Sequence, residues 1–283
     1  MVEQREARIN RVEKDLPEGL IVDSAWLEAK GIPSNLRSYY VKQGWLEQPV
    51  RSVYRRPRGS LNWQQVVVSL QAMLGVPLIV GGKTALELQG FSHYLSRETK
   101  SIHLYGPQKP PTWLGKLDLP QTFSYHNSKK LFQNTPITLG LDSLAWDIAN
   151  NTGHDLNRLQ GTSFTAMAWG QWDWPLTLSR PERAFLEMLD GLPAHESFHQ
   201  ADMIMQGAVN FSPRQLQKLL IDCSSVKVKR LFMFFADRHQ HAWLKRLDKT
   251  KIDLGKGKRV LVKGGRLDPE YLITVPEDID ADH

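Results

Sequence analysis

Residues 22–56, VDSAWLEAKGIPSNLRSYYVKQGWLEQPVRSVYRR, decide the fold of the first part of this chain. Asp23 is suited to N-cap a short helix, and Gly31 ends that helix because glycine adopts the left-handed conformation at C′ at little cost. A second helix begins with Ser34 as its N-cap and ends before Gly44. Two short helices joined by a tight, glycine-containing turn are typical of a helix-turn-helix unit.

A basic hairpin follows the second helix. Residues 45–47 and 53–55 flank turn-forming residues at 48–51, so this stretch predicts two antiparallel strands. Arg51 lies at the predicted tip of the hairpin, and the exit from the hairpin carries Arg55, Arg56 and Arg58. A helix-turn-helix followed by a basic hairpin predicts a winged-helix domain.

The second helix has two different faces. On a helical wheel Leu36 and Tyr40 lie on one side and predict the buried face. The opposite face carries the polar and cationic groups that read base edges in the major groove and hold phosphates, namely Asn35, Ser38, Tyr39 and Lys42. We place Arg37 at the wall of the groove, and we expect the hairpin to reach phosphates or the adjacent minor groove through Arg51, Arg55 and Arg56.

The remainder of the chain predicts an α+β protein in which the winged helix-turn-helix domain precedes a larger, mixed α/β C-terminal domain. We place the boundary between residues 1–98, which include supporting helices, and residues 99–283. The sequence pattern predicts helices over 61–74, 181–189 (with Ser179 as cap), 212–222 and 229–247, strands over 101–105, 121–126 and 135–139, and a hairpin over 254–267.

Composition bounds the class of protein. With 283 residues, 41% of them hydrophobic and 23% charged, the chain is typical of globular proteins and long enough for two domains. Its apolar runs are far shorter than the ~20 residues that span a bilayer, and its charged start does not resemble a signal peptide. The single cysteine, Cys223, allows no internal disulfide and no cysteine-based zinc site. We therefore expect a cytoplasmic protein.

Positive charge gathers late in the chain. Residues 214–266 contain 15 basic and 4 acidic residues, whereas residues 267–283 contain no lysine or arginine and 6 acidic residues. Such a segment suits contact with a polyanion, although a solvated basic face explains the same charges. The predicted second basic surface comprises Lys227, Lys229, Arg230, Lys256, Lys258, Arg259, Lys263 and Arg266.

Two short motifs suggest enzymes. Gly82-Lys83-Thr84 ends like a phosphate-binding loop, but Pro77 stands where that loop needs its first glycine, which favours a structural strand-to-helix turn. Residues 195–199 read HESFH, the spacing with which His195 and His199 would bind zinc and Glu196 would act as general base. No third ligand follows at the expected spacing. A zinc-dependent hydrolase is the alternative function.

Three further stretches carry a family resemblance. The segment 16–57, from LPEGLIVDSAW to SVYRRP, resembles the N-terminal winged helix of the AbiEi antitoxins and transcriptional regulators. VGGKTALELQG and IHLYGP are similar to the segment that follows it in that family. SVKVKRLFMFFADRHQHAWLKRLD and LGKGKRVLVKGGRLDPEYLITVP are similar to its C-terminal region.

The resemblance implies a DNA-binding autorepressor that is also the antitoxin of a type IV toxin–antitoxin, or abortive-infection, system. Its partners would be double-stranded DNA at the inverted repeats of its own promoter and a nucleotidyltransferase-like toxin, counteracted with or without direct contact. It implies no enzyme activity, cofactor, metal or membrane. An adaptor whose winged helix does not touch DNA is a further hypothesis. The operator, the toxin, the oligomeric state and the role of the late basic segment stay open.

Overall fold

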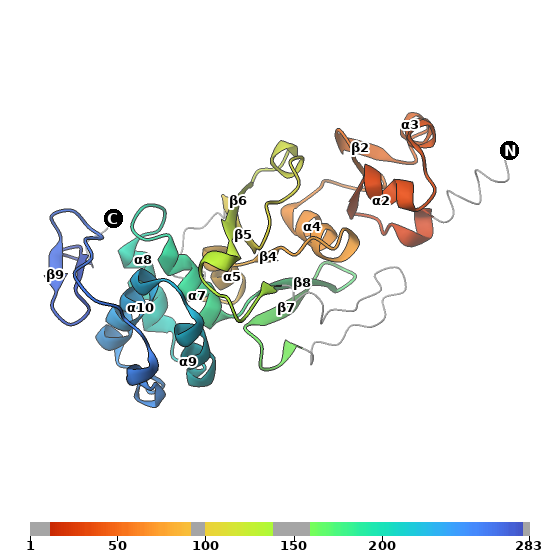
Figure 1. The fold of residues 1–283 in the computed structure, drawn as a ribbon. Coiled ribbons are helices and arrows are strands. Elements are labelled where there is room, and N and C mark those ends of the chain that lie inside the picture. Colours follow the sequence, from red (N-terminus) through yellow and green to blue (C-terminus); the bar gives the residue numbers. More distant parts are fainter. Residues whose placement is uncertain (1–11, 92–99, 138–158, 280–283) are drawn as a thin grey trace.

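The computed structural model describes residues 12–91, 100–137 and 159–279 (Figure 1). A three-stranded sheet and two short helices form one end of the molecule. The sheet has the order β1-β3-β2, with β1 (Ile21–Asp23) and β2 (Glu47–Val50) both antiparallel to β3 (Val53–Arg55). Helices α2 (Ser24–Ala29) and α3 (Ser34–Lys42) lie between β1 and β2 in the chain. This is a winged helix-turn-helix, as the sequence predicts.

Local capping explains where the two helices begin and end. The Asp23 carboxylate accepts a hydrogen bond of 2.8 Å from the amide of Trp26, so Asp23 is the predicted N-cap of α2. Gly31 and Gly44 follow the helices with φ of +78° and +73°. The cap of α3 differs from the prediction: Pro33 is the N-cap, and Ser34 is the first helical residue.

The chain then passes from the winged helix into a larger sheet. Helix α4 (Trp63–Val68) is fixed by a capping box between Asn62 and Gln65 and continues as the π-helical turn η1 (Ser69–Met73). Ser69 ties this segment to the winged helix, because its hydroxyl accepts a hydrogen bond of 2.9 Å from the amide of Ile21. Strand β4 (Ile79–Val80) and helix α5 (Gly82–Leu88) follow.

Five strands form this sheet in the order β6-β5-β4-β8-β7. β5 (Ser101–Gly106) pairs antiparallel with β4 and parallel with β6 (Thr122–Asn127). On the other side of β4, β8 (Trp174–Ser179) pairs in parallel and is antiparallel to β7 (Phe164–Trp169). β4 precedes the predicted boundary at residue 98, and both of its neighbours follow it. The division of the chain at that residue stays a prediction.

Four helices gather at the end of the molecule opposite the winged helix (Figure 1). They are α7 (Pro181–Asp190), α8 (Phe198–Gly207), α9 (Pro213–Asp222) and α10 (Val226–His239). α10 is apolar on most sides, and residues from Val228 to Ala236 are all buried. A small hairpin of β9 (Arg266–Asp268) and β10 (Ile273–Val275) closes the described chain. These features confirm the predicted mixed α+β class.

Several predicted elements differ from the structure. α10 ends at His239 because Gln240 adopts a left-handed conformation, so the helix does not reach residue 247. Ser179 ends β8 instead of capping α7, and its hydroxyl donates to Glu187. The C-terminal hairpin forms over 266–275, later than predicted. In the described part of the predicted strand 135–139, Thr135 lies in a bend held by Asp222.

Among the residues described, no helix is long and apolar enough to cross a membrane.

Candidate nucleic-acid interface

Helix α3 presents the polar face that the sequence predicts. Leu36 and Tyr40 are buried in the winged-helix core, which fixes the rotation of the helix. The residues predicted to contact bases, Asn35, Ser38, Tyr39 and Lys42, are all exposed.

Two of these polar side chains also bond locally. The Asn35 side-chain oxygen accepts from the amide of Leu36 at 2.9 Å, and the Ser38 hydroxyl donates to the carbonyl of Ser34 at 3.0 Å. The Asn35 NH2 group has no partner among the described residues, so it is the group that can donate to a base.

An exposed aromatic pair extends this face toward the hairpin. The rings of Tyr39 and Trp45 meet edge to face, with centroids 5.8 Å apart, and Trp45 also lies 5.4 Å from Tyr40. Trp45 is 42% exposed, which is unusual for so large an apolar side chain. Sequence reasoning assigned Trp45 to the hairpin and missed it as a surface residue. Its position directly after the C′ glycine of α3 is the signal that could have identified it.

Arg37 and Arg55, which are predicted DNA contacts, are largely buried. Arg37 is 7% exposed, and its guanidinium donates to Glu28 and to the Ile32 carbonyl, both at 2.8 Å. Arg55 is 8% exposed and donates to Glu47 at 2.6 Å and to the Gly59 carbonyl at 2.7 Å. Arg37 lies on the inner side of α3, and Arg55 lies on the central strand of its sheet. Both side chains therefore make contacts within the winged helix, and their role in DNA binding stays a prediction.

The other arginines of the wing differ in availability. Arg51 is exposed at the hairpin tip, beside Ser52, whose φ is +69°. Arg56 is less available, because it donates to Glu18 at 3.2 Å and to the Glu13 carbonyl at 3.1 Å. Arg51 is therefore the wing cation best placed for a phosphate.

The residues of the predicted second basic surface also differ in whether they are buried or exposed. Lys229 and Arg230 are buried in α10, and Arg230 donates to the carbonyls of Leu254 and Gly257. Lys227 donates to the Leu192 carbonyl at 3.0 Å. These three residues are structural. The exposed members, none of which pairs with a described acidic residue, are Lys256, Lys258, Arg259, Lys263 and Arg266.

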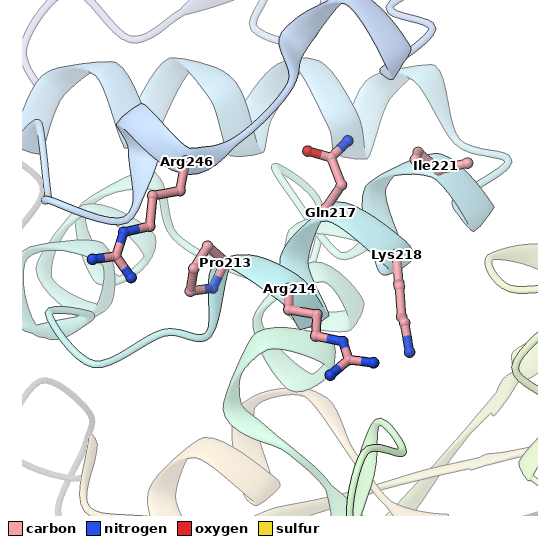
Figure 2. A pocket seen from close by; sticks show the side chains of 6 residues that line it. All are labelled: Pro213, Arg214, Gln217, Lys218, Ile221 and Arg246. Carbon is pink, nitrogen blue, oxygen red and sulfur yellow. The ribbon is translucent and has the colours of Figure 1, made fainter.

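A further cationic surface, distinct from the predicted second basic surface and not predicted from the sequence, lies along α9. Arg214 and Lys218 extend from the same side of that helix, and Arg246 approaches from the segment after α10 (Figure 2). They line an open groove of about 430 Å³ together with Pro213, Gln217 and the half-exposed Ile221. The spacing of Arg214 and Lys218, one helical turn apart on an exposed face, is the signal that could have found it.

The two enzyme-like motifs are used structurally. The amide of Gly82, which a phosphate would need, donates to the buried Glu187 carboxylate at 3.0 Å. α8 begins at Phe198 with Ser197 as N-cap, so His195 precedes the helix and does not share a helical face with His199. The described residues contain no cluster of three metal-ligating side chains. The geometry therefore does not support the hydrolase alternative.

The motifs nevertheless meet in space. Lys83 of α5 donates to Gln200 of α8 at 3.3 Å, and Nε2 of His103 in β5 lies 3.9 Å from the Glu196 carboxylate. His103 also contacts His126 of β6, with 3.0 Å between Nδ1 and Nε2. Burial lowers the pKa of His103 to about 4 and raises the pKa of Glu196 to about 7.

A winged helix with exposed basic surfaces is typical of DNA-binding regulators. The chain belongs to the AbiEi family of transcriptional regulators and antitoxins of type IV toxin–antitoxin systems. Residues 5–97 match the N-terminal domain of the AbiEi antitoxin transcriptional regulators, and residues 99–276 match the AbiEi antitoxin, type IV system regulator itself. The family consists of regulators and antitoxins, not enzymes. The resemblance seen in the sequence is thus confirmed.

A solved structure supports the fold. The chain is similar to the crystal structure of the RV2827C protein from Mycobacterium tuberculosis, with a TM-score of 0.54 and 15% sequence identity. The similarity covers 95% of this chain and 90% of that chain. No curated protein sequence is significantly similar to this chain.

Proposed function

We propose that this regulator represses its own promoter in the cytoplasm by placing α3 in the major groove at inverted repeats. The observation that carries the proposal is the exposed polar face of α3, because its rotation is fixed by the buried Leu36 and Tyr40. Asn35 and Ser38 are suited to base edges, and Lys42 and Tyr39 to bases or phosphates. Arg51 at the tip of the hairpin is suited to the flanking backbone.

The proposal predicts specific DNA binding that depends on Lys42 and Arg51. DNA from upstream of the gene should bind about 10³-fold more tightly than an unrelated fragment of equal length, as is common for specific sites. Replacing both cations by alanine should weaken binding to both fragments and reduce the slope of log K against log salt by roughly 2, because two phosphate contacts are lost. A fluorescence anisotropy titration at two salt concentrations measures both effects.

Two further variants sharpen this test. Lys109→Ala with Lys116→Ala removes the same charge from exposed residues outside the proposed interface, and it should leave affinity nearly unchanged. Asn35→Ala should instead alter sequence preference, by about 1–3 kcal/mol at the base pair it reads. If the Lys42/Arg51 variant binds the upstream DNA as tightly as the native protein does, the winged helix acts as an adaptor and the repressor proposal is wrong.

We further propose a division of labour at about residue 98, in which residues 99–283 counteract a nucleotidyltransferase-like toxin. This proposal is supported by the family match of residues 99–276 and by the five exposed cations of the C-terminal hairpin region. These cations suit an acidic or RNA-bound toxin, or additional DNA backbone on a bent site.

Charge reversal separates these two uses of the C-terminal cations. Lys256→Glu, Lys263→Glu and Arg266→Glu in one variant should abolish rescue of cell growth when the neighbouring toxin gene is co-expressed, while affinity for promoter DNA is retained. Growth assays with matched DNA titrations give this answer. Full rescue together with weakened DNA binding would assign the surface to DNA instead.

A further inference from the structure

A buried carboxyl group lies at the centre of the cluster formed by the two enzyme-like motifs. The Glu196 side chain is 5% exposed, although it stands in the connection between α7 and α8 and not in regular structure. Its position is built into the fold: a Cβ at residue 191 would lie 2.8 Å from Cγ of Glu196, so Gly191 makes the room that this side chain occupies.

This carboxyl group has no hydrogen-bond partner within the described chain. Its contact with Nε2 of His103, at 3.9 Å, is beyond hydrogen-bonding distance. Buried carboxylates normally accept several hydrogen bonds, because their desolvation is costly. Glu187, the other buried carboxylate of this region, shows the usual pattern and accepts from Arg183, Ser179 and Gly82. Glu196, in contrast, accepts no hydrogen bond from a described residue, and its carboxylate borders the adjacent open pocket.

Glu196 lines a cavity of about 560 Å³. Pro193, Phe198, Val262 and Pro276 supply apolar walls, and His195, Ser197 and Gln200 supply polar groups. Val262 and Pro276 come from the C-terminal hairpin region, so three parts of the chain line this open pocket. A small polar head group on an aliphatic stem fits such a lining.

The charged groups around the cavity are of both signs. Lys83 is the cation that acts on Glu196, and Glu87, one turn along α5, opposes it. The Lys83 ammonium is engaged by Gln200. The other titratable groups of this region are His103 and Tyr105 of β5, His126 of β6, Asp190 of α7, which pairs with Lys227 at 3.6 Å, and the exposed His195 and Lys263. The ionised Glu196 is the carboxylate among them that lines the cavity.

We propose that this cavity binds a ligand that carries an amino or guanidino group, whose N–H groups donate to the Glu196 carboxylate. A free amine or guanidine and an arginine or lysine side chain of a partner protein share this chemistry. An anionic ligand is disfavoured, because it would approach a buried carboxylate. The raised pKa of Glu196 agrees with this assignment: a cation compensates the charge that burial disfavours, so binding competes with a proton.

Isothermal titration of the full chain with argininamide and citrullinamide, both acetylated on the α-amino group, tests the proposal. The citrulline derivative has nearly the same shape without the charge, and it should bind at least tenfold more weakly. The affinity for argininamide should rise about tenfold between pH 6 and pH 8, because a carboxyl group with a pKa of about 7 is ionised to roughly one tenth and nine tenths at these values. The same pH dependence should persist in His195→Asn, which removes the exposed imidazole.

Two variants test the role of Glu196, and a second ligand distinguishes a free metabolite from a protein partner. Glu196→Gln should abolish argininamide binding, whereas Glu277→Gln, which removes an exposed carboxylate next to Pro276, should retain it. Comparing argininamide with a peptide that contains one internal arginine distinguishes the two sources of the ligand. Tighter binding of argininamide indicates a free metabolite, and tighter binding of the peptide indicates a protein partner. Equal affinity for citrullinamide, undiminished binding by Glu196→Gln, or no binding at millimolar argininamide would overturn the proposal.

Discussion

Replacing Arg183 with methionine is expected to lower the free energy of unfolding by about 3–5 kcal/mol, because it leaves a buried carboxylate without its cation. The Arg183 side chain is 0% exposed and the Glu187 side chain 1%, and Nε of the arginine donates to that carboxylate at 2.8 Å. The guanidinium also donates to the Thr135 carbonyl and lies over the rings of Phe132 and Phe164, 4.4 and 4.7 Å from their centroids. Chemical denaturation measures the change.

Two companion variants identify the cause. Adding Glu187→Gln to Arg183→Met should recover part of the loss, because the uncompensated charge disappears. Arg214→Met, on the exposed face of α9, should change stability by no more than about 0.5 kcal/mol. A loss below about 1 kcal/mol for Arg183→Met would show that the ion pair with Glu187 is not what holds this region together.

Replacing Glu196 with glutamine is expected to make the free energy of unfolding rise by about 2 kcal/mol between pH 4.5 and pH 6.5, relative to the native protein. The difference between the two proteins is the contribution of Glu196 alone, because His103, which has the opposite effect in the native protein, is present in both. Burial raises the pKa of Glu196 from 4.5 to about 7, so its contribution to stability is complete below pH 4.5 and is lost as pH rises toward 7. The pKa of His103 is lowered from 6.5 to about 4, so its contribution is present above pH 6.5 and is lost on acidification.

Over pH 4.5–6.5 the two contributions cancel in the native chain. Glu196→Gln removes the first and exposes the second, to which His126 adds because its pKa is also lowered by burial. Denaturant unfolding of both proteins at pH 4.5, 5.5 and 6.5 gives the difference, in which all other titrating groups cancel. His103→Gln should produce the opposite trend. Parallel stability curves for the native protein and Glu196→Gln would contradict the argument.

The parts of the fold that sequence predicts well are those determined by neighbouring residues. Asp23 caps α2, and Gly44 ends α3, because each acts on the adjacent turn. Strands β7 and β8 were not predicted, since β8 is buried along its whole length and lacks the alternation that marks a half-exposed strand. Helical periodicity likewise predicted the exposed face of α3.

The candidate site was harder to predict, because tertiary contacts decide which of its charged side chains are exposed and which are buried or paired. Arg37 and Arg55 read as DNA-binding residues because they are cationic, but Glu28 and Glu47 neutralise them after folding. Lys229 and Arg230 look equally basic in the sequence and are buried by packing of α10. Glu196 was noticed for a zinc motif, whereas its unusual environment arises from His103 and Gly191, which are distant or inconspicuous in the sequence.

The position of β4 bears on how such regulators can exchange DNA specificity during evolution. A crossover near residue 98 would transplant the central strand of the five-stranded sheet, Ile79–Val80, into a sheet whose other strands come from a different parent. The hybrid would then need two unrelated lineages to agree on strand register and on the fit of α5 against α7. A crossover between Pro57 and Leu61, in the exposed link after the wing, takes all five strands of that sheet from the same parent protein. Swapped recognition modules should therefore be joined there.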